Sequence, residues 1–336
     1  MLISVCNFAE RTKATFVKHG NAIITTDNRQ QVQAQAPVIV SASRATDIPA
    51  FYAPWFFDRL QKGYVRWRNP FSGHDSYVSF ANTRFIVFWS KNPAPLIPYL
   101  PILRNKEIGC YIQFTLNDYE AEGFEPVVPP LQQRIETFKR LVDMLGCGSV
   151  VWRFDPLLLT NSISIENLIE KITCIGDELK GYIEKLVFSF ADIAGYKKVG
   201  RNLSQAGVCY REWDDASMRE FAARLSEMNL KKWGYTLATC AEAIDLSEYG
   251  IEHNRCIDPV LIARLSPDDA VLQNFLYGAK SDSGQRKACG CILSKDIGAY
   301  NTCPHCCLYC YANTSPTSAA ANYRTHNNKP LSDSIL

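Results

Sequence analysis

Pro37-Val38-Ile39-Val40-Ser41-Ala42-Ser43-Arg44-Ala45-Thr46-Asp47-Ile48-Pro49 is the stretch that decides the fold we expect for this chain. Its β-branched run, residues 38–41, lies between a proline and a polar segment, which is typical of a short buried strand. An aromatic-rich amphipathic stretch, residues 51–60, follows the polar segment and predicts a helix that stops at Gly63. A strand, a polar loop and a helix in this order form the repeating unit of a parallel α/β fold.

The same unit recurs along the chain. Five further apolar runs, each followed by polar residues, predict strands at 85–89, 110–115, 150–155, 185–190 and 234–239. Helical patterns separate most of them, at 95–103 (weakly, because of two prolines), 131–145, 166–179 and 215–230. Parallel βα units of this kind form either a barrel or an open doubly wound sheet. In both architectures the active site lies at the carboxyl ends of the strands.

Three parts of the chain differ in pattern. Residues 1–36 are expected to form an N-terminal flap, with a strand at 22–26 and a polar loop at 30–35. Residues 37–315 carry the α/β pattern and the cysteine-rich segment, and we expect one large domain there. Residues 316–336 are expected to be a loosely held tail.

Composition excludes some classes of protein. The net charge of the 336-residue chain is +2, so no overall basic field indicates a nucleic-acid partner. No apolar run approaches the ~20 residues of a membrane-spanning helix, and the N-terminus becomes polar too early for a signal peptide. We therefore expect a cytoplasmic protein without membrane association. The odd count of 13 cysteines, clustered at one end, favours metal ligation over a disulfide framework.

The densest cysteine segment is Cys303-Pro304-His305-Cys306-Cys307-Leu308-Tyr309-Cys310. Cys303, Cys307 and Cys310 have C-x3-C-x2-C spacing, and three such thiolates can hold a cubic iron–sulfur cluster whose fourth iron has no protein ligand. Read as two C-x2-C pairs, the segment could bind zinc, although the adjacent Cys306 and Cys307 make a four-thiolate tetrahedron geometrically poor. Free thiols are the third alternative. The cluster interpretation is the strongest, and it leaves Cys306 without a ligand role.

A second set of cysteines lies in three other predicted loops. Cys240 ends the strand at 234–239, Cys256 follows it, and Cys289 and Cys291 are separated by one glycine. These four thiolates could hold a second iron–sulfur cluster or a structural zinc ion. Alternatively, Cys240 and Cys256 are buried apolar residues.

The segment from Cys303 to Cys310, with an aromatic residue before its last cysteine, resembles the cluster loop of radical S-adenosylmethionine enzymes. The resemblance implies that Cys303, Cys307 and Cys310 hold a 4Fe–4S cluster and that S-adenosylmethionine chelates the open iron. It also implies cleavage of this cofactor to a 5′-deoxyadenosyl radical that abstracts hydrogen from a substrate. A reductant protein such as flavodoxin or ferredoxin would supply the electron. The substrate stays open among small molecules, peptides and nucleic acids.

The loops after the predicted strands resemble those of the spore-photoproduct-lyase-like branch of that family, at residues 43–49, 89–93 and 114–141. That family places its cluster loop after the first strand, whereas here the loop comes last. Residues 295–300 would then end a displaced first strand. The resemblance thus implies a partial TIM barrel that is circularly permuted, with the cluster loop at the C-terminus, a change that domains tolerate where termini lie close together.

The same resemblance implies six cofactor-binding residues and leaves the catalytic residues unknown: Ser43, Thr46, Asp47, Lys91, Thr115 and Arg153. Lys91 would pair with the cofactor's carboxylate, and Asp47 or Thr46 would bind its amino group. Each has a plainer alternative: Lys91 as a solvated loop residue, Asp47 as a helix N-cap, and Arg153 as the structural partner of Asp155.

Four motifs together also resemble an uncharacterised family, the domain of unknown function 1848, over residues 37–315. They are the loop at 41–49, the strand ends at 88–93 and 152–156, and the C-terminal cysteines. This resemblance names no substrate. Two functions therefore remain: a radical S-adenosylmethionine enzyme, and a non-catalytic protein whose cysteines hold zinc or an electron-transfer cluster.

Overall fold

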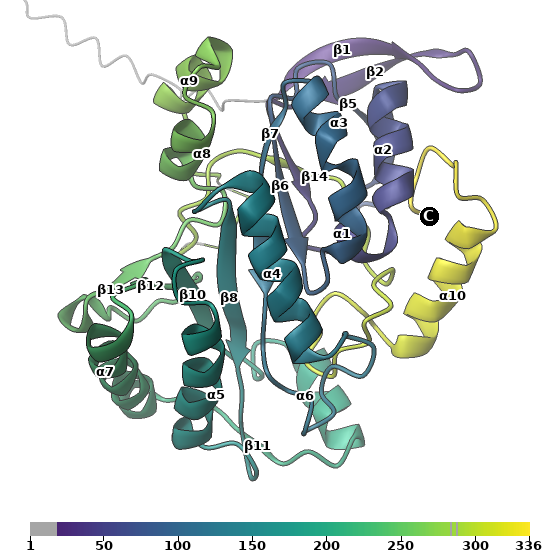
Figure 1. The fold of residues 1–336 in the computed structure, drawn as a ribbon. Coiled ribbons are helices and arrows are strands. Elements are labelled where there is room, and N and C mark those ends of the chain that lie inside the picture. Colours follow the sequence, from purple (N-terminus) through teal and green to yellow (C-terminus); the bar gives the residue numbers. More distant parts are fainter. Residues whose placement is uncertain (1–18, 283, 287) are drawn as a thin grey trace, which may run out of the picture.

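The protein is built around one large parallel sheet, as Figure 1 shows for the computed structural model. The structure describes residues 19–282, 284–286 and 288–336. The sheet has eight strands in the order β13-β12-β10-β8-β7-β6-β3-β14, and all its neighbours pair in parallel. Its strands are β3 (Ile39–Ala42), β6 (Phe85–Ser90), β7 (Gly109–Thr115), β8 (Val150–Leu157), β10 (Lys185–Phe190), β12 (Thr236–Thr239), β13 (Ile251–His253) and β14 (Lys295–Asp296).

The sheet is open. Its edge strands β13 and β14 do not pair with each other within the described part of the chain, so no closed barrel forms there. The predicted α/β class and the parallel strands are confirmed. All six strands predicted between residues 37 and 240 occur, within two residues of the expected ends.

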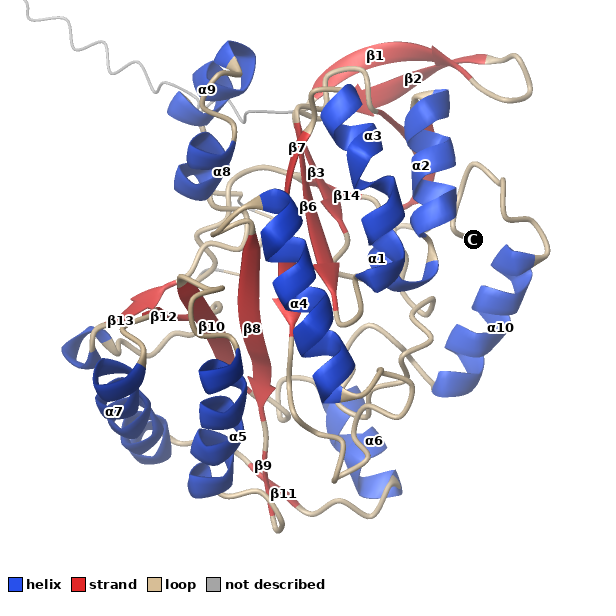
Figure 2. Cartoon of the chain, viewed as in Figure 1, coloured by secondary structure: helices blue, strands red, loops and turns tan. Residues whose placement is uncertain are grey.

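Helices cover one face of the sheet, which Figure 2 shows in blue in front of the strands. Alternate strand residues such as Ile86 and Phe88 face these helices, as the two-residue period of a strand requires. The helices of this face are α1 (Ile48–Phe51), α2 (Ala53–Lys62), η1 (Ala94–Tyr99), α3 (Leu100–Asn105), α4 (Leu131–Leu145), α5 (Ile165–Glu178) and α7 (Asp215–Lys232). A further helix, α6 (Lys197–Gln205), adds Val199 and Leu203 to the same core. Gly63 ends α2 in the left-handed region at φ 87°, as predicted.

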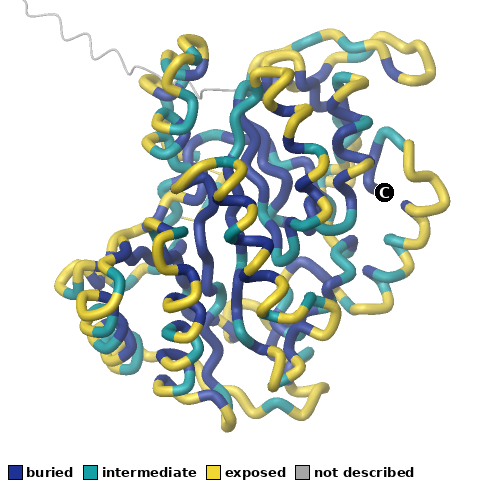
Figure 3. Tube along the Cα trace, in the orientation of Figure 1, coloured by how far each residue is buried: buried dark blue, intermediate teal, exposed yellow. Residues whose placement is uncertain are grey.

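A different segment fills the opposite face, which we call the inner face. Phe85 and Val87, between the residues that face the helices, pack there against Ile262 of α8 (Pro259–Leu265) and Leu272 of α9 (Ala270–Tyr277). Cys240, Cys256 and Cys291 belong to this second core. The strands between the two layers are buried, as the dark central tube of Figure 3 shows. The sequence pattern did not indicate that residues 254–294 would cover this face.

The last strand of the chain pairs with the first strand of the sheet. β14 runs parallel to β3, with Lys295 opposite Val40. The Asp296 carboxylate accepts hydrogen bonds from Ser41 Oγ at 2.7 Å, from Ser43 Oγ at 2.7 Å and from the backbone N–H of Arg44 at 2.8 Å. The predicted displaced strand at 295–300 therefore lies at the sheet edge beside β3, although only residues 295–296 are strand.

A small sheet flanks the main one, in the order β1-β2-β5-β4. It contains β1 (Gly20–Thr25), β2 (Gln31–Ala36), β4 (Tyr64–Arg68) and β5 (Asp75–Ser79). The polar loop expected at 30–35 is wrong, because this segment is the strand β2, antiparallel to β1. Its glutamines are exposed while Ala34 and Ala36 are buried, which is the alternation of a half-buried strand. Residues 1–18 of the expected flap lie outside the described residues.

The C-terminal segment expected as a loose tail is attached to the body. α10 (Pro316–Asn327) begins after Ser315, whose hydroxyl caps the helix. Trp55 Nε1 donates to the carbonyl of Ser332 at 2.8 Å, and Arg66 Nε pairs with Asp333 at 3.0 Å. The chain end therefore packs beside α2 and β4. The remaining short elements are β9 (Leu159–Thr160), β11 (Tyr210–Arg211) and η2 (Ser247–Tyr249).

No helix in the described residues is long and apolar enough to cross a membrane.

Gly109, at the start of β7, tests the contact between the sheet and the inner segment. A Cβ atom there would lie 2.7 Å from ring carbons of Phe85 and 2.4 Å from Ser266 Oγ, just after α8. We expect Gly109→Ala to destabilise the protein by about 1–3 kcal/mol through overpacking, measured by urea unfolding. In the control Gly278→Ala, the new Cβ meets only the carbonyl of Phe275 at 4.0 Å, so stability should stay within about 0.5 kcal/mol. Equal stability of both variants would contradict this packing.

Candidate functional site

The cysteine-rich loop after β14 lies over the carboxyl edge of the sheet, where β3, β6 and β7 end. Its backbone is anchored at both sides: Tyr52 Oη donates to the carbonyl of Thr302 at 2.6 Å, and the N–H of Leu308 donates to the carbonyl of Phe124 at 3.0 Å. Asn313 Nδ2 donates to the carbonyl of Cys303 at 2.8 Å. These contacts fix the loop to segments that are far away in the sequence.

Asp47 forms the first side-chain anchor of this loop. Its carboxylate caps α1 through the N–H of Ala50 at 2.9 Å, and accepts from Ser90 Oγ at 2.7 Å and from the N–H of Lys91 at 2.8 Å. His305 Nε2 lies 2.9 Å from Asp47 Oδ2, the oxygen that also accepts from the N–H of Lys91. Asp47 is therefore the N-cap of the plainer alternative, and it also joins the loops after β3 and β6 to the cysteine-rich loop.

Tyr309, the aromatic residue before the last cysteine, forms the second anchor. Lys91 Nζ donates to Tyr309 Oη at 2.9 Å and to Glu125 Oε1 at 2.8 Å. Asn117 Nδ2 donates to Tyr309 Oη at 3.0 Å, and the Tyr309 hydroxyl contacts Glu125 Oε1. Arg134 Nη1 lies 3.7 Å from the other oxygen of Glu125. We call Lys91, Asn117, Glu125, Arg134 and Tyr309 the tyrosine network.

The charges of this network hold one another in the ionised state. Burial raises the pKa of Glu125, but Lys91 and Arg134 outweigh it, so the pKa lies below the ordinary value. Burial lowers the pKa of Lys91, while Glu125 raises it above the ordinary value. Lys91 is thus neither the solvated lysine of one alternative nor a free cation for a ligand, because Glu125 already neutralises it.

The three thiols of the predicted cluster lie on one short loop. Cys307 is buried, while Cys303 and Cys310 are half-buried. Burial raises the pKa of the Cys307 thiol, and the Glu125 carboxylate raises it further, whereas Lys91 lowers it. Cys306, between them, has a left-handed backbone at φ 56°, which turns the chain between Cys303 and Cys307.

Three of the residues expected to bind a cofactor lie at strand ends near this loop. Ser43 donates to Asp296, which fixes the end of β3. Thr46 is buried, and its hydroxyl has no hydrogen-bond partner among the described residues. Thr115 ends β7 opposite Arg153 in register. Of the three, Thr46 is the residue with an unused polar group.

Arg153 lies on the inner face and points to the second cysteine set. Its Nε donates to Asp155 Oδ2 at 3.1 Å, and its Nη1 donates to Gln113 Oε1 at 3.2 Å and to Cys256 Sγ at 3.2 Å. Burial raises the pKa of Asp155, but Arg153 and the Ser189 hydroxyl lower it below the ordinary value. Arg153 therefore pairs with Asp155, which is the plainer of the two alternatives.

The structure brings the second cysteine set together. Cys240 Sγ and Cys256 Sγ are 3.4 Å apart, Cys291 is buried in the same core, and Cys289 packs against that core. As placed, no group of three or more His, Cys, Asp or Glu side chains in the described parts of the chain is arranged to hold a metal ion.

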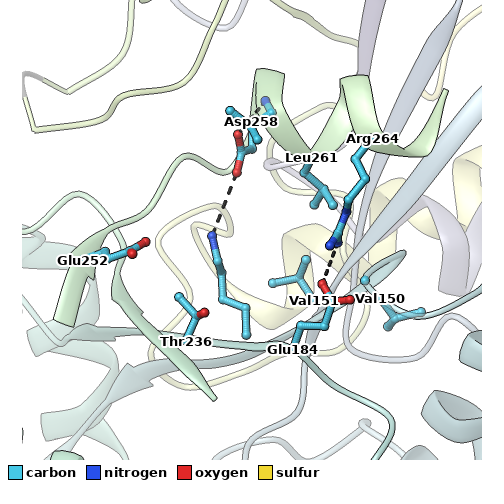
Figure 4. A pocket seen from close by; sticks show the side chains of 11 residues that line it. Val150, Val151, Glu184, Thr236, Glu252, Asp258, Leu261 and Arg264 are labelled. Carbon is cyan, nitrogen blue, oxygen red and sulfur yellow. Dashed lines mark hydrogen bonds and ion pairs between the residues drawn. The ribbon is translucent and has the colours of Figure 1, made fainter. Parts of the chain in front are cut away.

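A cavity of about 270 Å³ lies elsewhere, between α8 and the amino-terminal parts of β8, β10 and β12 (Figure 4). Arg264 and Glu184 pair across its wall at 2.6 Å. None of the residues predicted to bind a cofactor or metal lines this cavity. The candidate site is therefore the cysteine-rich edge and not this cavity.

The fold and site define an α/β protein with a cysteine-rich loop folded over the carboxyl edge of an open parallel sheet. The chain belongs to the family described as "Domain of unknown function (DUF1848)", whose family model matches residues 39–312. Comparisons with curated proteins and with solved structures found no match.

Sequence reasoning missed the partners that hold the loop. Asn117 and Glu125 come from the loop after β7, Arg134 comes from α4, and Asp296 comes from β14. Each was visible as a polar residue near a strand or helix end. Which of them would meet Tyr309 depends on strand order, and residue spacing does not contain that information.

Glu125→Gln should destabilise the protein by about 3–5 kcal/mol, because it leaves Lys91 and Arg134 buried without their counter-charge. Urea unfolding at neutral pH measures this loss. The depressed pKa of Glu125 also gives a sign for the pH dependence: its stabilisation is complete above the carboxyl's unfolded-state pKa and is lost as the pH falls through the folded-state value. Glu125→Gln should lack this acid-dependent part.

Glu178→Gln is the matched control, because Glu178 pairs with Lys139 at 3.0 Å on the surface. Removing this exposed pair should cost about 0–1 kcal/mol. If the two substitutions cost the same, the tyrosine network does not stabilise the loop as described.

Proposed function

We propose that the protein is an iron–sulfur enzyme of the radical S-adenosylmethionine type, in which Cys303, Cys307 and Cys310 hold a 4Fe–4S cluster. The observation that carries the proposal is that Cys303, Cys307 and Cys310 lie on one anchored loop at the carboxyl edge of a parallel sheet, where active sites of such sheets lie. His305 and Tyr309, inside the same loop, anchor it to the ends of three strands.

The ligand set fits such a cluster. Three thiolates at this spacing satisfy three iron corners, and thiolates placed at separate corners need not converge on one point as the ligands of a single ion do. Cys306 receives no ligand role, because its left-handed backbone serves the turn between Cys303 and Cys307. Buried N–H and O–H groups around the loop tune such a centre through hydrogen bonds and restricted solvent access.

The order of strands supports the same proposal. β14 lies beside β3 and is followed by the cysteine-rich loop, so this loop has the place that a loop after the first barrel strand would have. The open eight-stranded sheet is compatible with a partial barrel whose first strand comes last in the sequence.

When bound, the cluster and S-adenosylmethionine would supply an electron and a radical for hydrogen abstraction, chemistry that the protein itself does not provide. The chain's own residues position and shield that chemistry. The unpartnered hydroxyl of Thr46 is a hydrogen-bonding group for the cofactor. Lys91 and Glu125 hold the loop by their mutual charge. Asp155 and Ser189, which are hydrogen-bonded to each other near the ends of β8 and β10, would offer polar groups to a substrate.

Cys307→Ala should abolish assembly of the Cys303/Cys307/Cys310 cluster, whereas Cys306→Ala should leave it largely intact. After anaerobic reconstitution with iron and sulfide, electron paramagnetic resonance of the reduced protein measures this cluster. The two variants remove the same group from adjacent positions, so each controls for the other. Equal behaviour of both would contradict the three-ligand assignment.

Addition of S-adenosylmethionine to the reduced, reconstituted protein should perturb the cluster spectrum and release 5′-deoxyadenosine. Thr46→Val keeps the side-chain shape but removes the hydroxyl. It should lower the affinity for S-adenosylmethionine, measured by titrating the spectral change, by about tenfold, which is the scale of a lost hydrogen bond to a charged group. The non-catalytic metal-binding alternative would be favoured by either of two results. One is a cluster spectrum that does not change when S-adenosylmethionine is added, and the other is zinc bound tightly by the cysteines at 303–310.

A further inference from the structure

The inner face of the sheet carries a group of thiols that the proposed function does not use. Cys240 follows β12, Cys256 follows β13, and Cys289 and Cys291 precede β14. Cys240, Cys256 and Cys291 are buried, and Cys289 is half-buried. We call these four residues the inner cysteines.

The inner cysteines gather in one part of the inner face. The sulfur atoms of Cys240 and Cys256 are 3.4 Å apart. Cys291 is buried in the same core, and Cys289 packs against that core. Three separate loops thus bring four thiols into one core, an arrangement that their sequence spacing does not impose.

Their sulfur atoms are surrounded by N–H donors. Cys256 Sγ accepts from Arg153 Nη1 at 3.2 Å and from Asn254 Nδ2 at 3.4 Å, and Cys291 Sγ accepts from the N–H of Ile257 at 3.3 Å. Nη2 of Arg44 is buried without a hydrogen-bond partner in the part of the chain that the structure describes. A neutral thiol is a weak acceptor, whereas a thiolate makes strong charge-assisted hydrogen bonds.

These donors argue against an ordinary apolar core of cysteines. Buried cysteines that serve only for packing have aliphatic neighbours and need no cation. Here the buried guanidinium of Arg153 divides its N–H groups between Asp155, Gln113 and Cys256. N–H groups directed at ligand sulfurs are how proteins orient and tune thiolate metal centres.

We propose that Cys240, Cys256, Cys289 and Cys291 form a second metal centre with four thiolate ligands, separate from the one at Cys303, Cys307 and Cys310. Four thiolates suit a tetrahedral zinc ion or an iron–sulfur cluster. Because all four corners have protein ligands, this centre has no open position for a substrate. It fixes the segment at residues 254–294 to the inner face, beside Arg153 and Asp155.

The present spacing sets what binding requires. Neighbouring ligands of a tetrahedral zinc ion lie about 3.8 Å apart, from a Zn–S bond of about 2.3 Å, so Cys240 and Cys256 at 3.4 Å need only a small separation. The four side chains, as placed, do not form a ready metal-binding group in the described residues. Rotation of the half-buried Cys289 side chain, and a smaller adjustment of the others, would close the set.

The test uses a full-length triple variant, Cys303→Ala, Cys307→Ala and Cys310→Ala, which removes the first centre and leaves the inner cysteines unchanged. It is purified anaerobically and loaded either with zinc or with ferrous iron and sulfide, and its metal and sulfide content is measured. We expect one centre per chain, either a zinc ion or an iron–sulfur cluster with its visible absorption. Adding Cys256→Ser or Cys289→Ser should abolish that binding. Because Cys289 is only half-buried, its replacement should disturb folding less than that of Cys256.

The control adds Cys174→Ser and Cys209→Ser to the triple variant, because both of these cysteines are exposed, and metal content should not change. A triple variant that folds, as judged by circular dichroism, but binds neither zinc nor a cluster would overturn the proposal. So would metal that persists when Cys256 and Cys289 are both replaced. A failure of the first proposed centre can be told apart from a failure of the second. If Cys303, Cys307 and Cys310 hold no cluster, wild type and triple variant will have the same metal content.

Discussion

The pairing of β14 with β3 is the interaction on which the rest of this structure depends. It joins the last strand of the chain to the first strand of the main sheet, and the Asp296 carboxylate holds the junction by accepting from Ser41, Ser43 and the backbone of Arg44. This pairing brings the start of the cysteine-rich loop to the carboxyl ends of the strands, where His305 and Tyr309 anchor it. With it, a segment more than 250 residues away from β3 becomes the neighbour of its loop.

Buried charge explains why the loop stays in that place. Lys91, Glu125 and Arg134 lie where an unpaired ion would be strongly unfavourable, and they are stable because each has a partner at close range. Tyr309 shares that network, so the position of the last cysteine is coupled to the ionisation of a carboxylate on another loop. The same reasoning applies to Arg153 and Asp155, which tie the inner cysteines to the ends of β8 and β10.

The two sets of cysteines differ in what surrounds them. The set at 303–310 belongs to one loop at the edge of the sheet, next to the unpartnered hydroxyl of Thr46. The inner cysteines come from three loops and lie in the core of the inner face, and N–H groups are directed at the sulfurs of Cys256 and Cys291. This contrast is the physical basis for proposing an open, reactive centre in one place and a closed one in the other.

Local pattern in the sequence determined the βα units, the strand positions between residues 37 and 240, the helix stop at Gly63, and the C-x3-C-x2-C segment. These features depend on side-chain period and on residues close in the chain, so they can be read without the fold. Only the tertiary structure decided that residues 31–36 are a strand, that residues 254–294 fill the inner face, and which charges meet Lys91 and Arg153. Those outcomes depend on strand order and on burial against distant segments, because a polar residue at a strand end acquires its partner only when the neighbouring strand is known.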